Sequence, residues 1–212
     1  MNDKPLIEAK SLFCERDDRV LFESLSFDIH AGEMVQIEGP NGSGKTTLLR
    51  ILSGLSEAYE GEIYFNGEDI ASARAEYFSN LLYLGHKPGV KAVLTPVENL
   101  VSYTACRVNR SGAEIEAALA KVGLNGYEDV PCHSLSAGQH RRVALARLYL
   151  SDAPLWILDE AFTAIDKAGV KTLEQLMAQR VAEGGTIILT THHELSVGGG
   201  LRKITLGTGA IA

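Results

Sequence analysis

A glycine-rich loop between an apolar strand and an amphipathic helix constrains this chain more than any other feature. Residues 39–46 read Gly-Pro-Asn-Gly-Ser-Gly-Lys-Thr and fit the pattern G-x-x-x-x-G-K-[ST]. Residues 33–38 are a predicted strand, and the leucines and isoleucine of 45–54 recur at helical spacing up to a glycine. In this context the glycines let backbone N–H groups converge on phosphates, and the helix N-terminus adds a positive dipole.

The loop therefore predicts a site for the phosphates of a nucleotide, with Lys45 as a mobile ammonium and Thr46 as a hydroxyl ligand of Mg²⁺. An ordinary glycine-rich turn is the alternative, and at average glycine usage the pattern arises by chance in about one percent of chains this long. The residues expected to bind the nucleotide are Gly39, Pro40, Asn41, Gly42, Ser43, Gly44, Lys45, Thr46 and Thr47.

Two acids follow a short apolar run at 155–158. In open α/β sheets ligands bind at the carboxyl ends of the parallel strands, so Asp159 and Glu160 are expected to face the phosphate loop. Asp159 would hold Mg²⁺ through its water shell, and Glu160 would polarise an attacking water as the catalytic carboxylate. A strand followed by a solvated turn is the alternative for this pair taken alone.

The remaining pattern predicts a β-rich beginning and a parallel sheet. Strands are expected at 6–13, 20–29, 33–38 and 61–65, with a hairpin turn at Ala31-Gly32 and another turn at Asn66-Gly67. A capping box at Thr95 to Glu98 opens a mostly helical stretch near 96–123. The strands 155–158 and 186–190, with the helix 171–183 between them, predict a parallel βαβ crossover.

Composition excludes several classes of protein. The chain has 212 residues, is 45% apolar and carries a formal charge of −7, with lysines and arginines scattered along it, so nucleic acid is not expected as a partner. Cys14, Cys106 and Cys132 are odd in number and widely spaced, which predicts neither disulfides nor a zinc site. The N-terminal residues show no secretion signal, and no run of eighteen apolar residues predicts a membrane span.

A second helix start carries residues that suit either a cap or an anion site. Leu135-Ser136-Ala137-Gly138-Gln139 precedes a helical stretch, and Ser-x-x-Gln is a capping box. A serine hydroxyl, a glycine and the first N–H groups of a helix can equally bind a γ-phosphate. The residues alone leave both interpretations open.

Taken together, these motifs resemble the ATP-binding cassette (ABC) family. The Walker A loop at 39–46, the signature at 135–139, and the Walker B motif ending in Asp159-Glu160 occur in the family's order and spacing. Residues 163–166 resemble its D-loop, and Thr190-Thr-His192 resembles its switch histidine, with His193 adjacent. The resemblance covers nearly the whole chain.

What this resemblance implies is an α/β P-loop ATPase core with an antiparallel β subdomain and an inserted helical subdomain at about 70–135, all within one nucleotide-binding domain over 1–212. Two copies would pair head to tail around ATP and Mg²⁺. The signature would then act in trans, through Ser136, Ala137, Gly138 and Gln139. His192 would contact the γ-phosphate and keep Glu160 and the water aligned.

Within the family, LFCERDDRVLF, LGHKPGVKAVLTPVENL and WILDEAFTAID resemble the ATP-binding subunits of cytochrome c maturation systems. These subunits are peripheral proteins of the cytoplasmic face of the bacterial inner membrane. The resemblance implies a homodimer under integral membrane permease subunits, with ATP hydrolysis coupled to haem export or to release of a haem carrier. The rival interpretations are a soluble ABC ATPase without a permease, a motor for another cargo, and a nucleotide-binding scaffold with little turnover.

Four positions depart from the family pattern. His86 stands where relatives carry the glutamine that links Mg²⁺ and water to the membrane partner, so the resemblance implies His86 as a metal ligand, and Arg16 stands where an aromatic ring usually stacks on adenine. The Arg16 guanidinium could stack on the base or simply be solvated. Ala161 replaces a proline, and Ala137 replaces the first glycine of the signature, which is tolerable if its φ is negative.

Overall fold

The computed structural model describes residues 4–105, 108–196 and 200–207, so Cys106 lies outside the described part. The chain divides into two compact units. The first unit contains the described residues of Met1–Tyr83, Ala153–Glu160 and Glu174–Ala212, and the second contains those of Leu84–Asp152 and Ala161–Leu173.

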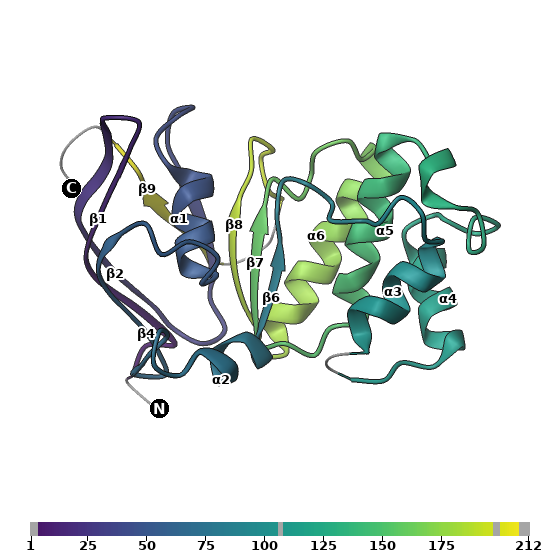
Figure 1. Cartoon of the computed structure of the whole chain (residues 1–212), viewed down its shortest axis with the longest axis horizontal. Helices are drawn as coiled ribbons and strands as arrows, with labels where there is room; N and C mark the ends of the chain where they lie inside the picture. Colours follow the sequence, from purple (N-terminus) through teal and green to yellow (C-terminus); the bar gives the residue numbers. More distant parts are fainter. Residues whose placement is uncertain (1–3, 106–107, 197–199, 208–212) are drawn as a thin grey trace. The chain divides into compact units, whose positions relative to one another are not determined.

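The first unit begins with a four-stranded antiparallel sheet (Figure 1). Its order is β2-β1-β4-β5, made by β1 (Ile7–Arg16), β2 (Arg19–Ile29), β4 (Glu60–Phe65) and β5 (Glu68–Asp69). Asn66 and Gly67 connect β4 to β5 with φ of 52° and 77°, as a two-residue hairpin turn of this kind requires. The predicted turn at these two residues is confirmed.

A five-stranded sheet of order β6-β7-β8-β3-β9 follows in the same unit, apart from Leu84 at the end of β6. Its strands are β3 (Met34–Glu38), β6 (Leu81–Leu84), β7 (Leu155–Asp159), β8 (Thr186–Thr190) and β9 (Leu201–Thr205). Every residue of β7 and β8 is buried, as expected for parallel strands covered on both faces. The helix α6 (Lys167–Ala182) connects them, which confirms the predicted parallel crossover.

The predicted hairpin at Ala31-Gly32 is wrong. The strand before it, β2, pairs with β1, whereas the strand after it, β3, pairs in parallel with β8 and β9. Gly32 adopts a φ of 82°, so the turn itself exists. Its physical role differs from the prediction because the apolar residues of β3 are buried in the other sheet, and the turn therefore carries the chain from one sheet to the next.

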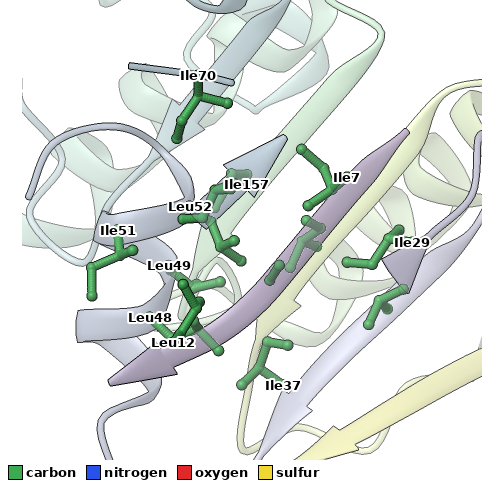
Figure 2. Packing of buried hydrophobic residues seen from close by; sticks show 14 of the residues in the cluster. Ile7, Leu12, Ile29, Ile37, Leu48, Leu49, Ile51, Leu52, Ile70 and Ile157 are labelled. Carbon is green, nitrogen blue, oxygen red and sulfur yellow. The ribbon is translucent and has the colours of Figure 1, made fainter. Parts of the chain in front are cut away.

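Two helices complete the packing of the first unit: α1 (Lys45–Leu52) and α2 (Arg74–Ser79). α1 contacts β7 and β8, and its apolar residues Leu48, Leu49, Ile51 and Leu52 are fully buried. Figure 2 shows these side chains together with Ile7, Leu12, Ile29, Ile37, Ile70 and Ile157. This core fixes the start of α1, and with it the phosphate loop, against the ends of the parallel strands.

The second unit is helical. It contains α3 (Pro96–Thr104), α4 (Gly112–Lys121), the short 3₁₀ helix η1 (Cys132–Ser134) and α5 (Ala137–Tyr149), with α3, α4 and α5 packed on one another (Figure 1). The predicted capping boxes at Thr95 and Ser136 are both present. The segment near 70–135, expected to be a helical insertion, also contains the strand β6.

Among the described residues, no helix is both long enough and apolar enough to cross a bilayer.

Candidate functional site

The phosphate loop joins β3 to α1, and its lysine folds back over it. The Nζ atom of Lys45 donates to the carbonyl oxygens of Gly39 at 2.7 Å and Pro40 at 3.1 Å. Gly44 caps α1 in the left-handed conformation, with φ of 94°, a conformation that a residue with a Cβ adopts only at a cost. The loop therefore places the ammonium and the helix N-terminus around the same small space.

The first glycine of the loop is required by close contact. A Cβ at Gly39 would lie 2.4 Å from the carbonyl oxygen of Leu206 and 2.7 Å from Oγ of Ser43. Ser43 Oγ is itself buried and has no hydrogen-bond partner among the described residues. Because a buried hydroxyl without a partner costs free energy, this atom fits a phosphate oxygen as its missing partner.

A hydroxyl and a carboxylate converge beside the loop. Thr46 Oγ1, on α1, donates to Asp159 Oδ1, at the end of β7, at 3.2 Å. Asp159 is only 1% exposed and also accepts from Thr190 Oγ1 at 2.7 Å. Burial raises the pKa of the neighbouring Tyr83, and the negative charge of Asp159 raises it further. A buried negative charge next to a hydroxyl offers the hard oxygen ligands that Mg²⁺ prefers.

The described residues contain no cluster of three or more histidine, cysteine, aspartate or glutamate side chains that could hold a metal ion. A single carboxylate and a hydroxyl suit Mg²⁺, which commonly takes one or two protein carboxylates and completes its shell with water and substrate phosphates. The donor set formed by Thr46 and Asp159 therefore fits that ion and not a fully protein-bound metal.

Glu160 follows Asp159 in a conformation that is rare for a residue with a side chain. Its φ is 52°, and its backbone N–H donates to both the carbonyl oxygen and Oγ1 of Thr190 at 3.1 Å. Such a conformation costs on the order of 1–3 kcal/mol and persists only where the surroundings hold it. Thr190 is thus the residue that holds both acids, through one hydroxyl and one carbonyl.

The two adjacent histidines after β8 approach different carboxylates. Nε2 of His192 lies 3.6 Å from Oε1 of Glu160, and Nε2 of His193 lies 3.4 Å from Oε1 of Glu174. The structure therefore places His192, and not His193, beside the predicted catalytic carboxylate. All four residues belong to the first unit.

A cavity of about 660 Å³ lies next to the phosphate loop. Its lining comes from one stretch of β2, from the loop and from the end of β9: Arg19, Val20, Leu21, Phe22, Glu23, Ser24, Leu25, Pro40, Gly42, Ser43, Thr205, Leu206 and Gly207. A Cβ at Gly42 would lie 3.5 Å from the guanidinium of Arg19. The Arg19 side chain makes no hydrogen bond or ion pair with another residue in the described part of the chain.

Arg16, expected to contact adenine, is not among the residues that line this cavity. It ends β1, its side chain is 72% exposed, and its Nε atom lies 3.5 Å from Asp17. The role assigned to Arg16 stays a prediction, and Arg19 is the arginine that the fold brings to the loop.

The signature residues lie in the second unit. Ser136 Oγ accepts from the backbone N–H of Gln139 at 3.2 Å, and Gln139 Oε1 accepts from the N–H of Ser136 at 2.8 Å. Ala137 begins α5 with a helical, negative φ, so it meets the condition set for replacing glycine. Gly138 lies close to the chain at Ala164, since a Cβ there would be 3.3 Å from its carbonyl oxygen.

His86 and the D-loop also belong to the second unit. Nη1 of Arg141 donates to the carbonyl oxygens of Gly85 at 2.9 Å and His86 at 3.3 Å, which fixes the backbone at His86. Asp166 is held by Arg142 Nη2 at 3.1 Å and by the N–H of Gly169 at 2.9 Å. The role predicted for His86 as a metal ligand stays a prediction.

Two residues of the candidate site were missed by the sequence reasoning. Thr190 was noted only as part of the switch motif. The available signal was a polar residue at the end of the apolar run TIILT, and in the structure this residue pairs in register with Asp159. Arg19 carried no local signal, because its importance depends on β2 lying next to a loop more than twenty residues away.

Comparison with known proteins gives a family and close relatives. The family model described as "ABC transporter" matches residues 22–163. A curated protein of Hahella chejuensis, named "Cytochrome c biogenesis ATP-binding export protein CcmA", is 59% identical over 203 residues, covering 96% of each chain. A protein of the same name from Pseudomonas fluorescens is 53% identical over 208 residues, covering 98% of this chain and 99% of its own.

Solved structures agree with this result at the level of the fold. A dimeric structure of a bacterial ABC transporter cassette is 25% identical, covers 94% of each chain and superposes with a TM-score of 0.82. The similarity thus extends over both units of the chain and is not confined to the nucleotide-binding motifs.

Proposed function

Because this chain belongs to the ABC transporter family, we propose that it is the ATP-binding and ATP-hydrolysing subunit of a membrane complex for cytochrome c biogenesis. Relatives with that printed name match almost the whole chain at 53–59% identity. The observation that carries the ATPase function is the 3.2 Å hydrogen bond between Thr46, at the end of the phosphate loop, and Asp159, the first of the two acids. We propose the whole of 1–212 as one nucleotide-binding domain.

The loop binds the nucleotide through its phosphates. Lys45 exchanges its bonds to the loop carbonyls for phosphate oxygens, and Ser43 Oγ and the first N–H groups of α1 donate to the same oxygens. Thr46 and Asp159 would hold Mg²⁺, which neutralises the charge that develops on the phosphates during transfer. Phosphoryl transfer needs mainly positioning and charge neutralisation, and these residues supply both.

Glu160 is the general base of this proposal. Its carboxylate orients the attacking water and accepts its proton, while His192, 3.6 Å away, donates to the γ-phosphate and keeps the carboxylate in place. The left-handed backbone at Glu160 is held in place because Thr190 accepts its N–H. The proposal keeps His86 as a further group for the metal and water arrangement.

A second copy of the chain completes the site. The solved cassette that superposes with this chain is dimeric, and we extend a head-to-tail homodimer to this protein. Ser136, Ala137, Gly138 and Gln139 would then face the γ-phosphate bound to the partner copy, using N–H groups at the start of α5. Nucleotide would thus hold two copies together, and hydrolysis would release them.

We further propose that the dimer works at the cytoplasmic face of the bacterial inner membrane, as a peripheral subunit bound to integral membrane permease subunits. The printed words "export protein" of the relatives support a membrane partner. The energy of ATP-driven closure would serve export of haem or release of a haem carrier. Nucleic acid is not proposed as a partner, in agreement with the charge of −7.

The test compares Mg-ATPase rates of the purified chain alone and of the chain with the membrane proteins that co-purify from its host. Lys45→Ala serves as the blank, because it removes the ammonium from the loop. Stimulation by a co-purifying permease is the expected result. Equal rates in both settings would favour a soluble ATPase, and no turnover in either would favour a nucleotide-binding scaffold.

A further inference from the structure

The loop after β8 is anchored by a carboxylate that the phosphate motifs do not include. Glu174 lies on α6, and its side chain is only 12% exposed. One of its oxygens, Oε1, accepts from the backbone N–H of Ser196 at 2.8 Å and lies 3.4 Å from Nε2 of His193. A single carboxylate oxygen thus ties two points of the segment 193–196 to α6.

The other end of the loop is held by different bonds. The N–H of His193 donates to Thr191 Oγ1 at 2.9 Å, which closes a tight turn around His192. Gln36 Nε2, on β3, donates to the carbonyl oxygen of Thr191 at 3.4 Å. The backbone of His192 therefore lies between one residue tied to β3 and another tied to α6.

Among the described residues, the side chain of His192 makes no hydrogen bond of this kind. Its side chain is 67% exposed, against 41% for His193, and it approaches Glu160 at 3.6 Å, which is longer than a hydrogen bond. A solvated imidazole samples several rotamers unless its backbone is fixed. The position of His192 relative to Glu160 is consequently set by the anchoring of its neighbours.

We propose that Glu174 is a positioning residue for hydrolysis, which holds His193 and Ser196 so that His192 faces Glu160. This inference rests on the proposed function, because it requires that Glu160 and His192 serve ATP hydrolysis. It assigns His193 a role distinct from that of His192. The His193 side chain anchors the loop to α6 through Glu174, and it does not contact the nucleotide. Glu174 makes none of these contacts with the phosphate loop. Its loss should therefore lower the rate of hydrolysis without changing the affinity for nucleotide.

The experiment measures kcat and KM for Mg-ATP in the full chain carrying Glu174→Ala, and, separately, the affinity for a fluorescent ATP analogue. The expected result is a kcat lowered about tenfold, as for a reacting group displaced by a fraction of an ångström or more, with unchanged nucleotide affinity. Glu174→Gln keeps an oxygen for the N–H of Ser196 and should restore most of the rate. Glu183→Ala, an exposed acid just after α6, is the matched control and should leave the rate unchanged.

Unchanged kcat in Glu174→Ala would overturn the inference, and so would a loss of nucleotide affinity that matches the loss of rate. If Glu174→Ala lost its folded state, judged by its thermal transition, His193→Ala would replace it with the same expectation, because it removes only the imidazole contact. Failure of the proposed function looks different: the wild-type chain would then hydrolyse ATP no faster than Lys45→Ala in any setting.

Discussion

Nε2 of His192 lies 3.6 Å from Oε1 of Glu160, although the two residues are thirty-two positions apart in the chain. Parallel pairing of β7 with β8 creates this proximity, because Asp159 is in register with Thr190, Glu160 follows Asp159 directly and His192 comes two residues after Thr190. The end of two buried strands therefore places a carboxylate and an imidazole at one edge of the sheet, as expected for ligand sites in such sheets.

Glu160→Gln is expected to bind ATP and to lose hydrolysis by on the order of a hundredfold or more, because the amide cannot accept the proton of the attacking water. The variant should also accumulate the closed dimer in the presence of Mg-ATP. Turnover assays and size-exclusion chromatography with nucleotide measure the two effects. Lys45→Ala is the contrasting control, since it should lose binding; near-normal turnover of Glu160→Gln would remove Glu160 from its assigned role.

Thr190→Val tests the residue that holds both acids. The substitution keeps the shape of the side chain but removes the hydroxyl that donates to Asp159 at 2.7 Å and accepts from the N–H of Glu160 at 3.1 Å. We expect a loss of about 1–3 kcal/mol in the free energy of unfolding, the usual result for buried polar groups deprived of a partner. The ATPase rate should fall as well.

Urea denaturation measures the stability change in Thr190→Val. The matched control is Thr172→Val, which removes an exposed hydroxyl on α6 that donates to the carbonyl oxygen of Ala168. Equal stability losses in the two variants would contradict the proposed role of Thr190.

How far the sequence predicts the structure depends on the range of the interactions. The strand and helix on either side of residues 39–44, the turn at Asn66-Gly67 and the capping boxes at Thr95 and Ser136 were predicted correctly, because their conformation is set by residues a few positions apart. The hairpin at Ala31-Gly32 was wrong, because pairing of β3 with β8 and β9 outweighs the local turn signal.

The strands β6 and β9 were missed for a related reason. They are the two edges of the five-stranded sheet. β9 is only partly buried, so its sequence LRKIT lacks the continuous apolar character of β7 and β8, whereas β6 is apolar and mostly buried but only four residues long. Edge strands of this kind are specified by the neighbour they pair with, which a single sequence does not display.

Both described cysteines are expected to resist alkylation in the folded chain. Burial raises the pKa of Cys14, with Arg16 opposing it weakly, and burial raises the pKa of Cys132, with the amide of Asn99 opposing it. At pH 8 less of each thiol is therefore ionised than in the unfolded chain, and thiolate is the reactive form. Iodoacetamide labelling followed by mass spectrometry of the separate peptides, with and without urea, measures the difference.

The raised pKa values of the two thiols also make the free energy of unfolding depend on pH. Because both thiols hold their protons more tightly in the folded chain, their contribution to stability is complete below the ordinary thiol pKa near 9.0 and is lost as the pH rises through the raised native values. If native Cys14 and Cys132 were labelled as fast as in the unfolded chain, the raised pKa values on which both predictions depend would be contradicted.

Arg19→Ala is expected to weaken nucleotide binding about five- to tenfold, which corresponds to about 1–1.4 kcal/mol. Arg19 lines the cavity beside the phosphate loop, its guanidinium lies next to Gly42, and its side chain is not engaged by other residues of the described chain. A guanidinium in that place can contact the phosphates or stack on the base. Arg16→Ala, a change of the same residue type three positions earlier, should alter binding less, because Arg16 lies outside the cavity lining.

Titration with a fluorescent ATP analogue at fixed salt measures both variants, and Arg19→Lys separates charge from planarity. Recovery of affinity in Arg19→Lys would indicate a contact to phosphate, for which a point charge suffices, whereas no recovery would indicate stacking on the base. A larger loss in Arg16→Ala than in Arg19→Ala would restore the adenine contact to Arg16, where the family pattern places it. Either outcome decides which of the two arginines takes the place where the family pattern puts a stacking aromatic ring.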